Sequence, residues 1–151
     1  MLKSFVENKH VIFCDSFDDW RDAIRAAAQP MIADGTIDDE YIVKLIKNVE
    51  EWGPYIIIAP NVAMPHSSVG TGGVHKTAIG FMKTKKPVVF DPEDESKNAQ
   101  LFFTLAAVDN EQHLNNMMAL SEMLMKDGII EDLLNAKTEQ DLLDINNKYS
   151  L

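Results

Sequence analysis

Short apolar runs alternate with turn-forming residues in the middle of the chain, and this pattern limits the possible fold more than any other feature. Val11–Cys14 is a further apolar run near the start, although its periodicity does not exclude a helical segment. The four central runs are rich in β-branched or aromatic residues, are bounded by Gly, Pro, Asp or Lys, and therefore predict strands. They are Tyr55–Ile58, Thr77–Met82, Val88–Phe90 and Leu101–Val108.

Two helices are predicted before this strand-rich region. Ser16–Asp19 has the spacing of a capping box, which predicts a helix over about Phe17–Ala33 that ends at Asp34–Gly35. Pro30 lacks an amide proton, so we expect it to kink this helix or to end a first segment of it. The second amphipathic helix is predicted over Asp38–Trp52, before a Gly-Pro stop.

The end of the chain returns to helical periodicity. Helices are predicted over Glu111–Lys126, over Ile129–Asn135 and over Glu139–Asn147, the last opened by Thr138. Helices on both sides of a central strand region indicate an α/β layered fold with about five strands.

The length and composition narrow the class of protein. A chain of 151 residues and 17.0 kDa without repeats or linkers predicts a single domain over residues 1–151. No apolar run approaches the ~18 residues of a membrane span, and the N-terminal residues show no secretory signal. The single cysteine fits a reducing cytoplasm, and a net charge of −10 argues against nucleic acid as a partner.

Most common catalytic and cofactor motifs are absent. The four histidines, His10, His66, His75 and His113, lack the close spacings of zinc ligands, so we expect no metal. The sequence contains no nucleophile elbow, phosphate loop or dinucleotide fingerprint, and no cofactor is expected. Cys14 lies in an apolar run without an adjacent base, which predicts a buried, inert thiol.

His66 stands out because it follows the Tyr55–Ile58 run on a loop of small residues, APNVAMPHSSVGTGG. Histidine has an ordinary pKa near ~6.5, so a neutral ring nitrogen is available as a nucleophile at neutral pH. The serines and glycines that follow leave amides and hydroxyls free to face an anion. His66 is thus a candidate phosphoryl acceptor, and the alternative is a surface histidine without a role.

His113 lies in the first turn of the helix that follows Leu101–Val108. Helix N-termini favour anions, so a phosphoryl group held between His66 and this turn would be stabilised. The alternative is that His113 is an ordinary helix-surface residue. His10 and His75 lack such a setting, and we expect both to be exposed to solvent.

These residues carry a resemblance to a known family. Gly53–His66, followed by Lys76–Thr77, Lys85–Pro87, Ala106–Asp109 and His113, resembles the mannitol/fructose-type enzyme IIA domain of the bacterial phosphoenolpyruvate-dependent sugar phosphotransferase system. The similarity covers essentially the whole chain and is greatest to the ascorbate-type branch. It implies a mixed β-sheet flanked by helices, phosphorylation of His66 on a ring nitrogen, and assistance of the phosphoryl group by His113.

The resemblance also implies the partners and the reaction. The histidine-containing phosphocarrier protein would donate a phosphoryl group to His66, and the cysteine of a IIB component would accept it, which serves the membrane IIC transporter indirectly. An exposed apolar patch that includes Met64, Met117 and Met118 is expected for docking, although core packing is an alternative for Met117 and Met118. The transported compound, ascorbate or a related sugar, cannot be read from this chain.

Departures from the family pattern leave two other functions open. Mannitol-type members have an arginine some sixteen positions before the histidine, whereas this chain has Glu50–Trp52 there and no arginine after Arg25. Lys76 is a candidate substitute, and Ser67 stands where many members have glycine. The alternatives are a regulatory IIA-like module that is phosphorylated on His66 without passing the group on, and a non-catalytic binding domain.

Overall fold

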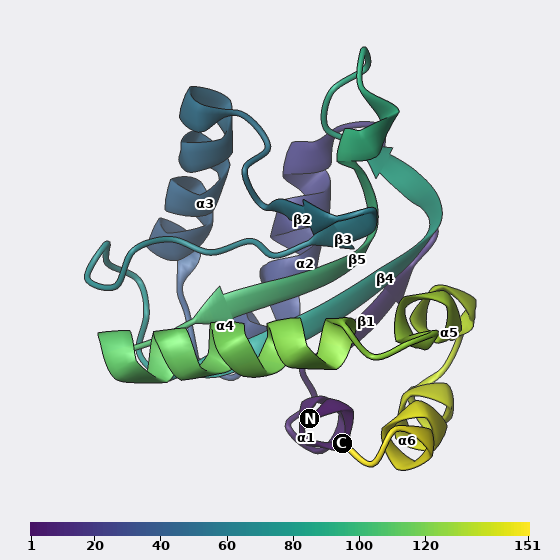
Figure 1. The fold of residues 1–151 in the computed structure, drawn as a ribbon. Coiled ribbons are helices and arrows are strands. Elements are labelled where there is room, and N and C mark those ends of the chain that lie inside the picture. Colours follow the sequence, from purple (N-terminus) through teal and green to yellow (C-terminus); the bar gives the residue numbers. More distant parts are fainter.

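A five-stranded sheet separates two layers of helices in the computed structural model, which describes residues 1–151 (Figure 1). The strand order is β1-β4-β5-β3-β2. The β1–β4 and β3–β5 pairs are parallel and the β4–β5 and β2–β3 pairs are antiparallel, so the sheet is mixed, as expected. The strands are β1 (Val11–Cys14), β2 (Ile57–Ala59), β3 (Asn61–Ala63), β4 (Ala78–Val89) and β5 (Asn98–Ala106).

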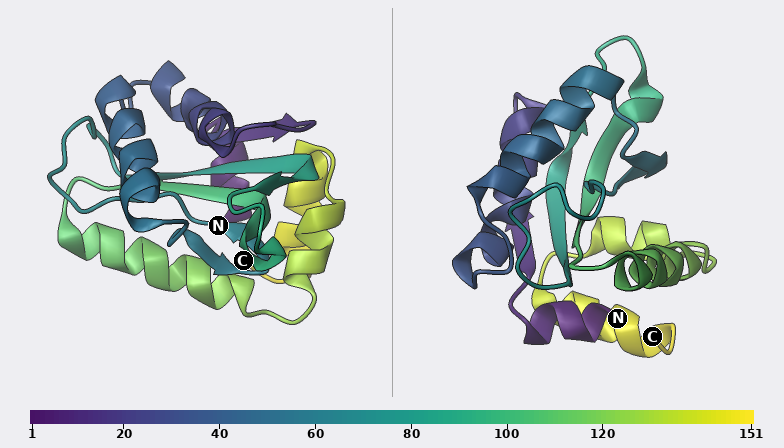
Figure 2. Two further views of the ribbon diagram at one scale, coloured as in Figure 1. Left: turned by 90° about the horizontal axis from the view of Figure 1, so that it is seen from above. Right: turned by 90° about the vertical axis from the view of Figure 1, so that its left-hand side faces the viewer.

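Helices cover both faces of the sheet, which confirms the predicted α/β class (Figure 2). Side chains alternate between the faces along each strand. Met82 and Phe102 accordingly enter the core under α2 and α3, whereas Phe81 and Phe103 enter the opposite core. None of the helices is both long and apolar enough to span a membrane. The helices are α1 (Leu2–Glu7), α2 (Trp20–Ala33), α3 (Asp39–Trp52), α4 (Asn110–Leu124), α5 (Ile129–Asn135) and α6 (Glu139–Lys148).

The start of α2 differs from the prediction. The helix begins at Trp20, and its N-cap is Asp19, whose carboxylate accepts a hydrogen bond from the amide of Arg21 at 2.9 Å. The predicted capping box with Ser16 is therefore wrong. Pro30 does not divide the helix either, because α2 is continuous to Ala33. Since Pro30 lies in the last turn, it interrupts the helical hydrogen bonds only close to the end of the helix.

The predicted number of strands is right, but the strands are not all those expected. Thr77–Met82 and Val88–Phe90 form one long strand, β4, and the polar residues between them lie at an irregularity in its pairing with β5. The Tyr55–Ile58 prediction starts too early, because β2 begins at Ile57. The sequence analysis missed β3, whose short run Asn61–Ala63 pairs with β5 and leads directly into the His66 loop.

The two ends of the chain lie side by side, as Figure 1 shows. Helix α1, which the sequence analysis missed, packs against α6, with Leu2 and Phe5 buried. The side-chain oxygen of Asn146 accepts hydrogen bonds from the Met1 amino group and from the amide of Lys3. The α5 and α6 predictions are confirmed, including the Thr138 capping box of α6, and α4 begins one residue earlier than expected.

Candidate active site

The loop that carries His66 leaves the sheet at the end of β3. Two backbone contacts hold its first residues: the amide of Met64 donates to the carbonyl of Ile56 at 2.8 Å, and the amide of Leu105 donates to the carbonyl of Pro65 at 2.9 Å. The second contact continues the parallel β3–β5 pairing beyond the end of β3. The two residues before His66 are therefore still hydrogen-bonded to neighbouring strands or turns of the sheet, and His66 is the first loop residue after them.

The imidazole of His66 is oriented by a hydrogen bond to its own loop. Nδ1 lies 2.5 Å from the carbonyl oxygen of Met64. A carbonyl oxygen only accepts, so Nδ1 carries the proton and the lone pair of the neutral ring is on Nε2. Tyr55 packs edge-on against the ring, with 5.4 Å between ring centroids, and its hydroxyl donates to the His66 carbonyl at 2.7 Å.

A buried tyrosine connects this loop to the sheet and to α3. The Tyr41 hydroxyl donates to the carbonyl of Leu105 at 2.6 Å and accepts a hydrogen bond from the amide of Ser67 at 3.3 Å. Asn48, on the same helix, donates its side-chain amide to the Ser67 hydroxyl at 3.0 Å. Ser67 is buried, so its hydroxyl belongs to the support of the loop. The serine that replaces the family glycine thus has two partners on α3.

The far end of the loop is fixed at Gly73. Its carbonyl accepts a hydrogen bond from the amide of Asp38, the N-cap of α3, at 2.9 Å. Gly73 has φ +79°, and a β-carbon there would lie 2.5 Å from the amide nitrogen of Tyr41. Only glycine fits this backbone conformation and this close approach. The loop is consequently attached to the sheet at one end and to the start of α3 at the other.

His113 lies beside His66, as the sequence predicted that it could. Asp109 caps α4 by accepting a hydrogen bond from the amide of Gln112 at 2.8 Å, which places His113 in the first turn. The ring centroids of His66 and His113 are 6.1 Å apart. Burial, together with the proximity of His66, lowers the pKa of His113 below its ordinary value. His113 is therefore neutral at physiological pH, and its Nδ1 is buried without a hydrogen-bond partner.

Both histidines line one cleft of about 720 Å³ between α3, the His66 loop and α4. Lys44, Asn48 and Trp52 line it from α3, at a spacing of four residues that places them on one side of the helix. Helix α4 contributes Asn110, His113 and Met117, and the loop contributes Ser67, Ser68, Val69 and Thr71. Lys44 is the only lysine or arginine in this lining, and it makes no ion pair.

The sequence analysis missed Lys44, Asn48 and Tyr55 as residues of the site. The sequence did contain a partial indication of this role. Lys44 and Asn48 are four residues apart at the edge of the apolar face of α3, the helix that precedes the His66 loop in the chain. Nothing in the sequence, however, showed which side of α3 faces His66. Tyr55 was assigned to a strand, although it lies in the turn before β2.

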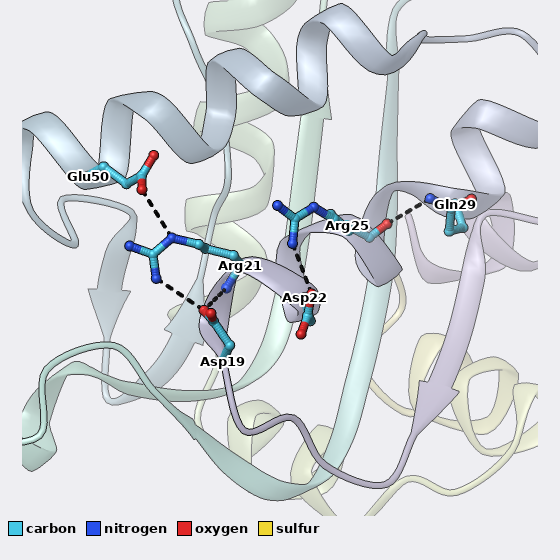
Figure 3. Close-up of polar contacts among 6 residues, drawn as sticks. All are labelled: Asp19, Arg21, Asp22, Arg25, Gln29 and Glu50. Atoms are coloured by element: carbon cyan, nitrogen blue, oxygen red, sulfur yellow. Dashed lines mark hydrogen bonds and ion pairs between the residues drawn. The ribbon is translucent and has the colours of Figure 1, made fainter.

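Lys76, the candidate substitute for the family arginine, does not line the His66 cleft. Lys76 lies outside the cleft, where its Nζ donates to the carbonyl of Asp34 at 3.4 Å. Glu50, at the arginine position, accepts a hydrogen bond from Nε of Arg21 at 3.1 Å, and Asp19 binds the same guanidinium (Figure 3). The side chain of Glu50 is thus engaged with α2 and does not line the cleft around His66.

Of the other residues singled out in the sequence, His10 and Cys14 differ from expectation and His75 does not. His10 is buried, not exposed, because its Nε2 contacts the carboxylate of Asp34 at 2.6 Å. His75 is exposed, as predicted, and pairs with Asp38. Cys14 is only half-buried, and burial raises the pKa of its thiol. In the structure, no three His, Cys, Asp or Glu side chains are placed to hold a metal ion.

The methionines expected at a docking patch separate into two groups. Met64 is 3% exposed and belongs to the core, so its assignment to an exposed patch is wrong. Met117 is half-buried and lines the His66 cleft, whereas Met118 is 54% exposed. The exposed methionine surface next to the cleft is therefore on α4.

The site thus consists of two neighbouring histidines in a cleft beyond the end of β3. Comparison with known proteins identifies the family of this chain. Residues 4–149 match the family described as "Phosphoenolpyruvate-dependent sugar phosphotransferase system, EIIA 2". The chain belongs to this family, as the sequence resemblance implied.

Two relatives from Escherichia coli K12 are similar along nearly their whole length. The ascorbate-specific PTS system EIIA component is 29% identical over 94% of this chain and 92% of its own. The mannitol-specific cryptic phosphotransferase enzyme IIA component is 32% identical over 95% and 96%. The solution structure of an E. coli enzyme IIA of that same description superposes with a TM-score of 0.83, at 32% identity and the same coverage.

A further solved structure shows the fold in a complex. It contains enzyme IIA for mannitol and phosphorylated enzyme IIB for mannitol, both from E. coli. Its IIA chain superposes with a TM-score of 0.78 at 22% identity, over 91% of this chain and 93% of that one. That likeness shows the fold, and the family match over residues 4–149 makes the chain an EIIA component of a sugar phosphotransferase system.

Proposed function

We propose that this chain is a phosphoryl carrier that accepts a phosphoryl group on Nε2 of His66 from the histidine-containing phosphocarrier protein and passes it to a cysteine of a IIB partner. The observation that carries the proposal is the hydrogen bond between His66 Nδ1 and the Met64 carbonyl. This bond leaves the lone pair on Nε2 of a ring that lines an open cleft. A phosphoryl acceptor requires such a nucleophile and no activating base.

Each transfer is a displacement at phosphorus in which atoms and charge balance. The lone pair of Nε2 forms the new N–P bond while the N–P bond to the donor histidine breaks, and that histidine keeps the electron pair. In the second transfer, a cysteine thiolate of IIB attacks the phosphorus, and the electron pair of the N–P bond returns to Nε2. Nδ1–H stays bound to the Met64 carbonyl throughout, so the ring does not need to rotate.

The cleft supplies groups that can stabilise the transferring phosphoryl group. Lys44 is the one cation in the lining and has no carboxylate partner, so its charge is available to the anion. His113 is neutral, and its role is therefore hydrogen bonding, not charge neutralisation. The side chains of His113 and Thr71 each have a buried polar atom without a partner. We assign Lys44 the role expected for the missing arginine.

The surface beside the cleft suits two successive protein partners. Met118 is exposed on α4, Met125 is exposed at the C-cap of this helix, and Trp52 is exposed on the α3 side of the cleft. Flexible methionines adapt to more than one partner surface. The complex of the E. coli mannitol IIA and IIB enzymes supports the assignment of a IIB partner. The membrane IIC transporter is an indirect partner, and the proposed transported compound is ascorbate or a related sugar. A cytoplasmic location of the chain remains a prediction.

The test is intact-mass spectrometry after incubation with phosphoenolpyruvate, enzyme I and the phosphocarrier protein. We expect the wild-type chain to gain one acid-labile phosphoryl group and His66→Ala to gain none. His75→Ala is the matched control, because His75 is exposed outside the cleft and should leave the modification intact. His113→Ala should slow the gain without abolishing it. A wild-type chain that stays unmodified beside charged phosphocarrier would overturn the proposal and favour a non-catalytic binding domain.

A second step distinguishes a carrier from a regulatory module. The phosphorylated chain is mixed with purified IIB proteins for ascorbate and for mannitol, and the phosphoryl group on the IIB cysteine is measured by intact mass. We expect the phosphoryl group to move to IIB within the mixing time of a manual assay. A chain that accepts the group on His66 but retains it with IIB present would instead be a regulatory IIA-like module.

A further inference from the structure

A second cavity lies at the β1 edge of the sheet. Its volume is about 660 Å³, and it shares no lining residue with the His66 cleft. The cavity lies between the C-terminal end of β1, the middle of β4 and the loop that joins α5 to α6. Its lining, which we call the lysine pocket, consists of Phe13, Cys14, Asp15, Lys83, Lys85 and Lys137.

Lys83 is the unusual member of the lysine pocket. It is 7% exposed, and it lies opposite Phe13 on β1 and Leu101 on β5. No hydrogen bond or ion pair is formed by its ammonium group. Burial, together with Lys137 and Lys85, lowers the pKa of Lys83. A buried charge without a partner is costly, so this position requires an explanation.

The carboxylates at the lysine pocket form no ion pair with Lys83 or Lys137. Asp15 pairs with the exposed Nζ of Lys85 at 3.2 Å. Asp141 accepts hydrogen bonds from the amides of Lys137 and Thr138 at the start of α6. The ammonium groups of Lys83 and Lys137 therefore form no ion pair, and the nearby charge of Asp141 offsets theirs only in part. The chain has a net charge of −10, whereas the lining of this cavity is locally positive because two of its lysines have no ion-pair partner.

We propose that the lysine pocket binds a small organic phosphate, a monoester whose dianionic phosphate lies between Lys83 and Lys137 and whose organic part packs against Phe13. Two lysines without a carboxylate partner match the two charges of a phosphate monoester, and lysine is a common phosphate ligand. A volume of about 660 Å³ is typical of clefts for small organic molecules and far exceeds the size of a phosphate ion. Cys14 remains a neutral thiol and does not repel the anion.

The binding test uses isothermal titration with glycerol 3-phosphate and glucose 6-phosphate, with glycerol, glucose, succinate and inorganic phosphate for comparison. We expect one of the two esters to saturate a single site with a Kd of about 1 mM or below. Lys83→Met should weaken binding by about 10-fold or more, because one charge-assisted contact is lost. Lys86→Gln is the matched control: this lysine is exposed on the same strand, does not line the pocket and should not affect binding.

Cys14 reports where the ligand is, because it is the only cysteine and lines the lysine pocket. We expect the bound ester to slow alkylation of Cys14 by N-ethylmaleimide in the wild type but not in Lys83→Met, with the mass of the intact chain as readout. His66→Ala should retain both binding and protection, which separates this site from the proposed phosphoryl carrier. Lys83→Met should melt no lower than the wild type, because it removes a buried unpaired charge.

Three results would overturn the proposal. The first is that neither ester saturates the protein. The second is that Lys83→Met and Lys86→Gln bind the ester equally. The third is that succinate or inorganic phosphate binds as tightly as the esters. Equal binding of succinate would mean that the phosphate group contributes nothing, and equal binding of inorganic phosphate would mean that the organic part contributes nothing.

Discussion

The carbonyl oxygen of Met64 accepts a hydrogen bond from Nδ1 of His66 at 2.5 Å, and this contact leaves the lone pair of the neutral ring on Nε2. We expect phosphorylation on Nε2, with Nδ1 protonated both before and after transfer. Nitrogen-15 NMR of the phosphorylated chain with labelled histidine measures this directly, since phosphorylated and protonated ring nitrogens have different shifts. A phosphoryl group on Nδ1 would require the Met64 contact to break and would contradict the prediction.

Lys44 should affect the rate of phosphoryl transfer more than the stability of the fold. Lys44→Gln removes the only cation of the His66 cleft, so we expect phosphorylation of His66 to slow by about 10-fold or more. Lys47→Gln is the control, because Lys47 is exposed on the same helix and does not line the cleft. Quenched-flow or manual sampling with mass detection gives both rates, and equal rates in the two variants would exclude the proposed role of Lys44.

His113 should make stability depend on pH just below neutrality. Burial and His66 lower its pKa in the folded state, so the unfolded chain binds the proton first as the pH falls below about 6.5. Folding stability contributed by neutral His113 is therefore present above this pH and is lost as the pH falls towards the lowered, folded-state pKa. Urea unfolding between about pH 7.5 and about pH 5, a range that includes this value, should show a smaller loss in the free energy of unfolding for His113→Gln than for the wild type.

The same titrations contain their own check. The other histidines are present in both proteins, so only the difference between wild type and His113→Gln reports on His113. A constant difference across the pH range would mean that His113 has the same pKa folded and unfolded. Such a result would contradict the neutral hydrogen-bonding role that we assign to it.

The elements around the site show how much a single sequence reveals. The α3 prediction is confirmed almost to the residue, because five buried apolar positions repeat with helical spacing and Gly53, at φ +77°, ends the helix. The strand β3 was not predicted, because three residues after Pro60 carry too short a pattern, and parallel pairing with β5 is a long-range contact. The position of His66 followed from loop composition, whereas its attachment to the sheet did not.

The residues that the sequence analysis misplaced share one physical cause. Lys76, Met64 and His10 were judged from their neighbours in the chain, whereas their environments come from distant elements. His10 is buried and contacts Asp34. Burial alone would raise the pKa of Asp34, but hydrogen bonds from Thr36 and His10 outweigh this effect and lower the pKa to about 2. Lys44 lines the cleft because of the rotation of α3 about its own axis as it packs on the sheet. The helical pattern in the sequence does not show how this rotation relates to the position of His66.

Tyr41→Phe should separate the support of the His66 loop from its chemistry. The substitution keeps the buried ring but removes the hydroxyl that bridges the Leu105 carbonyl and the Ser67 amide. Because a buried carbonyl is then left without its partner, we expect a loss of about 1–3 kcal/mol in the free energy of unfolding. The released loop should also slow phosphorylation of His66, since the histidine precedes Ser67.

Tyr55→Phe is the companion variant, because its hydroxyl also bonds this loop, at the His66 carbonyl, but from a more exposed position. We expect a smaller loss of stability from it, and a smaller effect on the rate, since water can replace the lost donor. Urea unfolding and phosphorylation rates on both variants test the pair. If Tyr41→Phe changed neither quantity, the hydroxyl bridge would not hold the loop, and the geometry of His66 would have to come from the β3–β5 pairing and the Met64 contact alone.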